Sequence, residues 1–223
     1  VIDADPQGNT TSGFGFERDN LENTLYDGMI NGISMKDIIL KTRYENLDLV
    51  PSHADLAGAE IEMNQDSEKE LRIKKLIDQL NSKYDYIFID CPPSLGLISI
   101  NALTASHSVL IPIQCEYYAI EGVSQLVKTI DLVRRGLNIP LEVEGIALTM
   151  YDGRTKLSLQ VAEEVRKFFK ERVYKTVIPR NVRLAEAPSY GETIQEYAPS
   201  SKGAIAYKKL AKEFVKKGKD SGE

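Results

Sequence analysis

Two aspartates near the start of the chain have the type and spacing to orient a metal ion and a nucleophilic water. A short apolar run leads directly into Asp3 and Asp5, and Pro6 and Gly8 mark an immediate turn. At such a turn one carboxylate can face a metal ion or the loop while the other faces a nucleophilic water. A β-turn capped by an aspartate side chain explains the same residues. The pattern by itself therefore leaves a catalytic and a structural interpretation open.

A third aspartate, Asp90, ends the apolar run of residues 86–89. An apolar strand that ends in aspartate is typical of a Walker B element, whose carboxylate holds Mg²⁺ through water because Mg²⁺ keeps much of its hydration. Aspartate also starts turns and caps helices, so the structural interpretation is favoured while this signal stands alone.

Other polar residues follow further strand-like runs. Parallel sheets bind ligands beyond the carboxyl ends of their strands, which makes these residues candidates as well. They are Gln114 and Glu116, Asp152 and Arg154, and the segment Pro179, Arg180 and Asn181.

Alternating strand and helix patterns must position these side chains. Strands are predicted at residues 47–51, 86–89, 109–113, 143–149 and, briefly, 177–178. Apolar stripes of helical period predict helices at 71–80, 123–136, 161–169 and 205–215, the last with Ser200 or Ser201 as its N-cap. This alternation predicts an α/β fold with a mostly parallel, twisted sheet and helices on both faces. Residues 1–217 are expected to form a single domain, and residues 218–223 a flexible tail.

The composition is that of an ordinary soluble domain. The chain has 223 residues, of which 42% are hydrophobic and 27% are charged, and its net charge is −5. It contains no apolar run of about 18 residues that would span a membrane. The acidic balance argues against a protein covered in positive charge, although lysines are concentrated in residues 202–219. Cys91 and Cys115 are predicted to be buried, reduced thiols of a cytoplasmic protein.

Four ordered segments together resemble one protein family. They are Asp3–Thr11, Asp90–Gly96 with its continuation to Leu103, Ile113–Gly122, and Ile178–Gly191. On these motifs the chain is identified as a member of the ParA/Soj family of chromosome- and plasmid-partitioning ATPases, which are deviant Walker A, SIMIBI-type P-loop NTPases. The resemblance implies an ATP- and Mg²⁺-dependent homodimer that binds double-stranded DNA without sequence preference. It also implies hydrolysis stimulated by a ParB-type centromere-binding protein, a cytoplasmic, nucleoid-associated location and no membrane partner.

The resemblance also implies roles for individual residues. Asp5 would orient the water that attacks the γ-phosphate, and Asp3 would support the metal and the switch region. Asp90 would bind Mg²⁺ through water. The adenine would be framed by Pro179 and Asn181, with Arg180 beside them. Arg154 and Arg183 would contact DNA phosphate; taken singly, each arginine is more simply explained as a surface ion pair.

The family's Walker A segment has no counterpart in these residues. The pattern G-x-x-x-x-G-K-[ST] does not occur in the sequence. A strand, P-loop and helix, about 30 residues or more, are therefore expected before Val1. The alternative is a chain that has lost catalysis. Without that unit, residues 1–223 are expected neither to hydrolyse ATP nor to fold well, because apolar strand edges would be exposed.

Three alternative functions share the fold or part of the surface. A MinD-type membrane ATPase would insert its C-terminal amphipathic helix into lipid, and residues 201–217 fit this loosely. A non-catalytic module would keep Arg154, Arg183 and a partner surface without using ATP. A metabolic synthetase of the same superfamily would need a substrate pocket that the sequence does not reveal.

Overall fold

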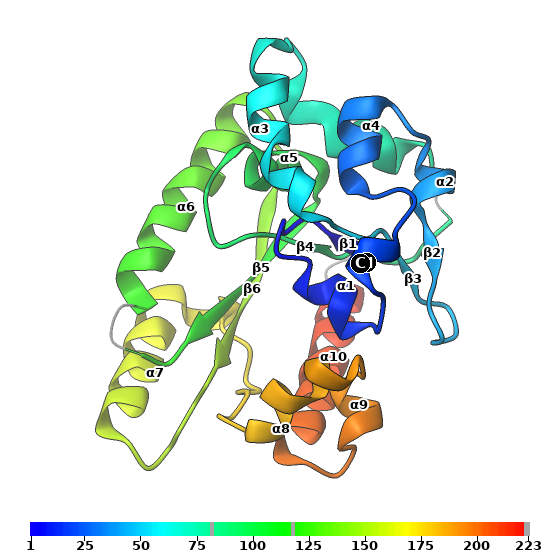
Figure 1. The fold of residues 1–223 in the computed structure, drawn as a ribbon. Helices are drawn as coiled ribbons and strands as arrows, with labels where there is room; N and C mark the ends of the chain where they lie inside the picture. The colour runs from blue at the N-terminus through cyan, green and yellow to red at the C-terminus, as the bar shows by residue number, and fades with distance from the viewer. Residues whose placement is uncertain (81–82, 117–118, 221–223) are drawn as a thin grey trace. The chain divides into compact units, whose positions relative to one another are not determined.

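The computed structural model describes residues 1–80, 83–116 and 119–220, which form two compact units (Figure 1). The first unit comprises Val1–His107 with Leu132–Leu141, and the second comprises Ser108–Asp131 with Glu142–Glu223. Each unit is described in turn. The helix α6 (Ala119–Gly136) contributes residues to both.

The first unit is built on short strands that end at the candidate carboxylates. Strand β1 (Ile2–Asp3) pairs in parallel with β4 (Ile89–Asp90), so that Asp3 lies in register with Asp90. A parallel bridge joins Ile2 to Val50, which directly follows β3 (Asp48–Leu49). Strand β2 (Leu40–Lys41) pairs with β3 in antiparallel fashion. The parallel pairing of β1 and β4 brings two candidate aspartates to one sheet edge.

Short helices surround these strands and bury one apolar core. They are α1 (Asn9–Gly13), α2 (Met35–Ile38), α3 (Ala59–Glu62), α4 (Arg72–Asp78) and α5 (Leu97–Ala105), with 3-10 turns at Arg18–Asn20, Ala54–Ala57, Met63–Gln65 and Lys69–Leu71 and a π-helical turn at Asp27–Asn31. Leu25, Met29, Ile38 and Ile73 are fully buried in this core. Asn138, which follows α6, donates from Nδ2 to the backbone oxygens of residues 103 and 106 at 2.9 and 2.7 Å. These two hydrogen bonds satisfy carbonyl groups at the C-terminal end of α5 that have no partner within the helix.

The second unit contains the longest strands. Strand β5 (Ser108–Gln114) pairs in parallel with β6 (Glu142–Thr149), and parallel bridges add Val173 and Pro179 beyond β6 (Figure 1). Its helices are α7 (Lys156–Phe169), α8 (Val182–Glu186), α9 (Ile194–Tyr197) and α10 (Lys202–Asp220), with 3-10 turns at Lys170–Arg172 and Ala187–Tyr190.

The C-terminal helix α10 packs its apolar stripe inside the second unit. Ala206 and Leu210 lie in one buried cluster with Ala147 of β6. A Cβ at Gly203 would lie 2.6 Å from the Leu184 side chain, so a glycine at this position allows α10 to approach α8 closely. The apolar stripe of α10 is therefore used in the core of this unit. Among the described residues, no helix is both long and apolar enough to cross a bilayer.

The predicted α/β class and its mostly parallel pairing are confirmed. The strands predicted at 109–113 and 143–149 are present, and so are the helices predicted at 123–136, 161–169 and 205–215, the last of which extends to Asp220. Ser201 is the predicted cap of α10, and its Oγ accepts from the Ala204 N–H at 3.1 Å.

Several predicted boundaries were wrong. Only Ile89 of the predicted strand 86–89 is in a strand, and residues 177–178 form no strand, although the Ile178 N–H donates to the Leu148 oxygen at 2.8 Å. Helix α10 continues through Gly218 to Asp220, where a tail was predicted. One glycine weakens a helix by only about 1 kcal/mol relative to alanine, and its lysine neighbours are good helix formers.

Candidate nucleotide and DNA sites

Asp3 is a fully buried carboxylate at the end of β1, and backbone and hydroxyl donors occupy both of its oxygens. Its Oδ2 accepts from the Thr11 N–H at 2.8 Å and the Thr11 hydroxyl at 2.7 Å, and its Oδ1 accepts from the Asp5 N–H at 3.2 Å. The Thr11 Oγ1 accepts in turn from the Ser52 N–H at 3.0 Å. Burial raises the pKa of Asp3 above its ordinary value; the Thr11 hydrogen bonds oppose the shift, and the Asp90 carboxylate adds to it. This environment favours a residue that holds the turn over one that contacts a metal directly.

We expect Asp3→Asn to lower the free energy of unfolding by about 1–3 kcal/mol, the usual cost of leaving a buried donor unsatisfied. Asparagine keeps the size of the side chain but offers one acceptor oxygen to the three donors that Asp3 now serves. Denaturant unfolding monitored by circular dichroism measures the loss, with Asp19→Asn, an exposed aspartate of the first unit, as the matched control. Equal stability of the two variants would contradict a holding role for Asp3.

Asp5 lies in the turn that follows β1 and is half-buried. Its Oδ1 accepts from the Gln7 N–H at 2.9 Å, and its backbone oxygen accepts from the Gly8 N–H at 2.9 Å. Gly8 has a φ of 62°, the left-handed conformation that glycine adopts without strain. The capped turn of the structural interpretation is thus present. Because Oδ1 makes the turn, Oδ2 is the oxygen left for a catalytic role.

Asp90 is exposed at the end of β4, and Thr10 links it to the turn. The Thr10 hydroxyl donates to Asp90 Oδ2 at 2.6 Å, which joins two segments 80 residues apart in sequence. The link from Thr10 was missed in the sequence; the only signal was a pair of threonines directly after the turn. Carboxylate and hydroxyl oxygens are the hard donors that Mg²⁺ prefers, so the residues present fit that ion.

The thiol of Cys91 lies near the carboxylates of Asp90 and Asp5. Loss of hydration and, to a smaller extent, these two carboxylates together raise the pKa of this thiol to about 12. Both cysteines are free; Cys115 is buried as predicted, whereas the prediction of burial was wrong for Cys91, whose side chain reaches the surface. In the part of the chain that the structure describes, no three His, Cys, Asp or Glu side chains are grouped as a metal site. A cation here would therefore draw most of its ligands from water and phosphate.

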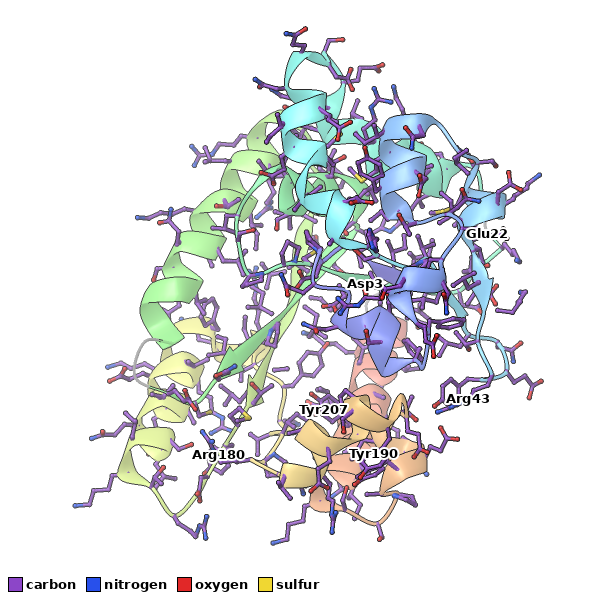
Figure 2. All side chains as sticks on the ribbon, viewed as in Figure 1. Asp3, Glu22, Arg43, Arg180, Tyr190 and Tyr207 are labelled. Atoms are coloured by element: carbon purple, nitrogen blue, oxygen red, sulfur yellow. The ribbon has the colours of Figure 1, made fainter. Side chains whose placement is uncertain are left out.

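The predicted adenine segment lies in the second unit, where Pro179 bridges to Tyr151 and Asn181 caps α8. The Asn181 Oδ1 accepts from the Arg183 N–H at 2.9 Å. Arg180, labelled in Figure 2, donates from Nη2 to the Glu116 carboxylate. The cap leaves the Nδ2 amide of Asn181 as the donor that could read a base acceptor.

Arg154 and Arg183, the two arginines predicted to contact DNA, both form ion pairs on the surface. Arg154 donates from Nε and Nη2 to the two oxygens of Asp152 at 2.9 and 2.8 Å, and its side chain is 90% exposed. Arg183 donates from Nη1 to Glu186 Oε2 at 2.7 Å. The surface ion pairs that the sequence offered as the simpler explanation are therefore present. Both arginine side chains are also exposed, so the ion pairs do not exclude contact with DNA.

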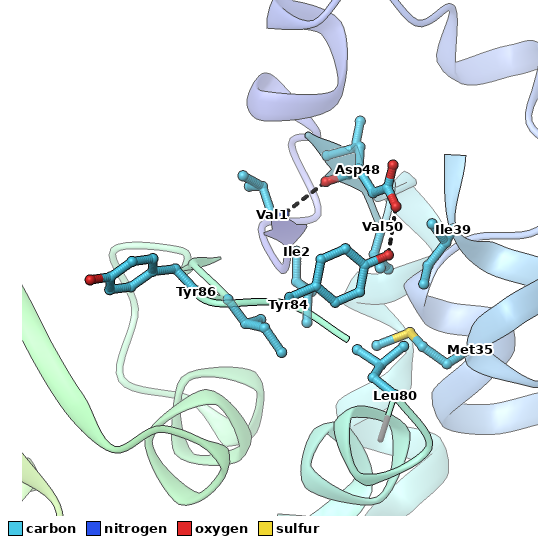
Figure 3. A pocket seen from close by; sticks show the side chains of 11 residues that line it. Val1, Ile2, Met35, Ile39, Asp48, Val50, Leu80, Tyr84 and Tyr86 are labelled. Atoms are coloured by element: carbon cyan, nitrogen blue, oxygen red, sulfur yellow. Dashed lines mark hydrogen bonds between the residues drawn. The ribbon is translucent and has the colours of Figure 1, made fainter. Parts of the chain in front are cut away.

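A small pocket in the first unit has no features of a phosphate site (Figure 3). Its lining is mainly apolar, and Asp48 is the lining residue with a charged side chain. Val1 donates to the Asp48 backbone oxygen at 2.8 Å, and the Tyr84 hydroxyl donates to Asp48 Oδ2 at 2.6 Å. The pocket lies among core residues and is separate from the carboxylates described above.

The chain is similar to known partitioning proteins along almost its whole length. Residues 1–143 match a family model described as an AAA domain. The sporulation initiation inhibitor protein Soj of Bacillus subtilis is 55% identical over 98% of this chain and 86% of its own length. The chromosome partitioning protein ParA of Myxococcus xanthus is 48% identical over 97% of this chain and 77% of its own length.

Solved structures share the fold. A cobyrinic acid a,c-diamide synthase of Mycobacterium smegmatis, solved with bound ADP and magnesium, superposes with a TM-score of 0.84 at 33% identity and covers all of this chain and 82% of its own. The fold is accordingly that of a SIMIBI-type P-loop NTPase. None of these alignments tests whether a strand, P-loop and helix precede Val1, which stays a prediction. The sequence similarity to partitioning proteins is much higher than that to the synthase, and the chain belongs to the ParA/Soj family of chromosome-partitioning ATPases.

Proposed function

We propose that this protein couples ATP hydrolysis to reversible DNA binding as a homodimer, and that a ParB-type partner stimulates the hydrolysis. The observation that carries the proposal is the carboxylate edge formed by β1 and β4. Asp3 and Asp90 are in register there, Thr10 ties Asp90 to the turn, and Asp5 lies within that turn.

Each residue of this edge has a distinct proposed role. Asp90 and Thr10 would hold Mg²⁺, largely through water, and the bound ion would neutralise charge on the ATP phosphates. Asp5 would accept a hydrogen bond from the attacking water through Oδ2, while its Oδ1 keeps the turn closed. Asp3 would act on neither ATP nor metal directly, because its oxygens are already used to position Thr11 and Asp5.

The adenine would be recognised in the second unit by Pro179, Asn181 and Arg180. Asn181 contributes two functions from one side chain: Oδ1 caps α8, and Nδ2 can donate to a ring nitrogen of the base. Glu116 holds the guanidinium of Arg180 beside this segment.

The two functions of Asn181 can be separated by substitution. Aspartate is as good an N-cap as asparagine but offers no donor to the base. We expect Asn181→Asp to keep the stability of α8 while weakening ATP binding by about 10-fold, the loss of one hydrogen bond of roughly 1.4 kcal/mol. Asn181→Ala should weaken ATP binding and lower the melting temperature as well. Calorimetric titration with ATP and thermal unfolding measure the two effects; unchanged ATP affinity in Asn181→Asp would exclude Asn181 from base recognition.

DNA contact is assigned to Arg154 and Arg183, both exposed and both suited to a bidentate contact with phosphate. Because the chain carries a net charge of −5, the contact surface is confined to a local patch. DNA affinity should therefore fall steeply as salt is raised.

The proposal is tested with the protein in its natural length, by measuring phosphate release from ATP with Mg²⁺, alone and with DNA and a ParB-type protein of the same organism. Slow turnover that rises several-fold when both are present would support it. A protein that binds neither ATP nor DNA under these conditions would overturn it.

A further inference from the structure

Each arginine assigned to DNA contact already forms an ion pair with a carboxylate close to it in the sequence. Asp152 and Arg154 are separated by one residue, and the guanidinium forms a two-point contact with the carboxylate. These hydrogen bonds lower the pKa of Asp152 to about 2, so the carboxylate remains charged at any physiological pH. The arrangement is the one that a guanidinium would make with a phosphate.

The second ion pair, between Arg183 and Glu186, lies on α8. Arg183 donates to Glu186 at 2.7 Å, one helical turn further along, and the Tyr197 hydroxyl donates to the same oxygen of Glu186 at 3.1 Å. Tyr197 stacks on Tyr190 with ring centroids 5.1 Å apart, which fixes the phenol that holds Glu186.

Both carboxylates are less exposed than the arginines that they bind. The Asp152 side chain is 20% exposed, and the backbone N–H of Asp152 donates to Ser158 Oγ at 3.0 Å, which fixes the backbone that carries this carboxylate. Tyr197 holds Glu186, which is half-buried. The Arg154 side chain is 90% exposed and that of Arg183 is 55% exposed. The exposed guanidiniums are therefore the groups that can move to exchange a carboxylate for a phosphate.

We propose that Asp152 and Glu186 compete with DNA phosphate for Arg154 and Arg183 and thereby set the DNA affinity. The inference rests on the proposed DNA-binding function and adds the internal groups that limit it. An exposed ion pair is worth about 0.2–1 kcal/mol, which corresponds to a change of about 1.4- to 5-fold in binding. A competitor of this strength weakens each phosphate contact without preventing it, which suits a protein that must release DNA.

The test compares neutral variants of the two carboxylates in the natural-length protein with ATP and Mg²⁺. We expect Asp152→Asn and Glu186→Gln each to bind a random-sequence duplex about 1.4- to 5-fold more tightly at fixed salt. Removing any negative charge raises DNA affinity slightly, so Glu163→Gln, an exposed carboxylate of α7, is the matched control. Fluorescence anisotropy at several salt concentrations measures the affinities.

A double-mutant cycle decides whether the gain passes through the arginine. If Asp152 competes for Arg154, the gain from Asp152→Asn disappears in the Arg154→Ala background. A gain that persists there, or one no larger than that of Glu163→Gln, overturns the inference while the DNA-binding function stands. Wild-type protein that fails to bind DNA even at low salt overturns the proposed function instead. Because Glu186 also contacts Tyr197, thermal unfolding of Glu186→Gln checks that α8 remains folded, and Tyr197→Phe shows the effect of losing the phenol alone.

Discussion

Asp5→Asn is expected to lower ATP turnover by about 100-fold or more, the usual effect of removing a residue that assists proton transfer or water orientation. Asparagine can still accept the Gln7 N–H through its Oδ1, so the turn that follows β1 is kept. What is lost is the negative charge on the second oxygen. ATP binding and ATP-dependent DNA binding should therefore survive, and the variant should stay on DNA longer than the wild type. Phosphate release over time measures the first effect and DNA dissociation the second.

The control for Asp5→Asn is Asp19→Asn, which removes an exposed aspartate of the same unit and should leave turnover unchanged. Turnover of Asp5→Asn within a few-fold of the wild type would mean that Asp5 only makes a capped turn. A loss of ATP binding together with turnover would mean that the variant has disturbed the site.

Reversing both arginine charges, Arg154→Glu with Arg183→Glu, is expected to reduce DNA affinity by well over 10-fold. Each lost phosphate contact reduces the steepness of log affinity against log salt by about 0.9. The corresponding double alanine variant, Arg154→Ala with Arg183→Ala, should therefore show a slope that is less steep by about 2. The glutamates add repulsion from the phosphates to that loss. Affinities measured from low to moderate salt give both numbers.

Arg135→Ala with Arg172→Ala is the matched control for the alanine pair, because both arginines are exposed and the change in net charge is the same. This control should change the salt slope little. A loss in the control equal to that of Arg154→Ala with Arg183→Ala would show that overall charge, and no defined patch, governs DNA binding.

Long, regular patterns in the sequence predicted the matching elements well. Strand β5 is an almost continuous apolar run and the second half of β6 is apolar, while α7 and α10 carry one apolar stripe each, so period and length both identify these elements. Helix α5 was missed because it is buried on nearly all sides and has no stripe; Ser99, Asn101 and Thr104 are buried with its apolar residues. Strand β4 is shorter than its apolar run because the hydrogen bonding that defines a strand depends on neighbours that a run of apolar residues does not specify.

The main residues of the candidate site were predictable from the sequence, but the residues that hydrogen-bond to them were not. The rule that ligands bind beyond the carboxyl ends of parallel strands made Asp3 and Asp90 candidates, and the structure then places them in register. The sequence did not reveal that Asp3 is fully buried and occupied by Thr11, because burial depends on packing from distant segments such as Ser52. It also did not reveal that Glu186 holds Arg183, since a carboxylate three residues away on a short helix is often solvated instead.

DNA binding by the natural-length protein, measured side by side with ATP, with ADP and without nucleotide, tests the central claim most directly. The account predicts binding to random-sequence DNA with ATP and Mg²⁺, weak binding in the other two states, and prolonged binding of Asp5→Asn with ATP. Equally tight binding in all three states would contradict it and would support a DNA-binding module that does not use ATP.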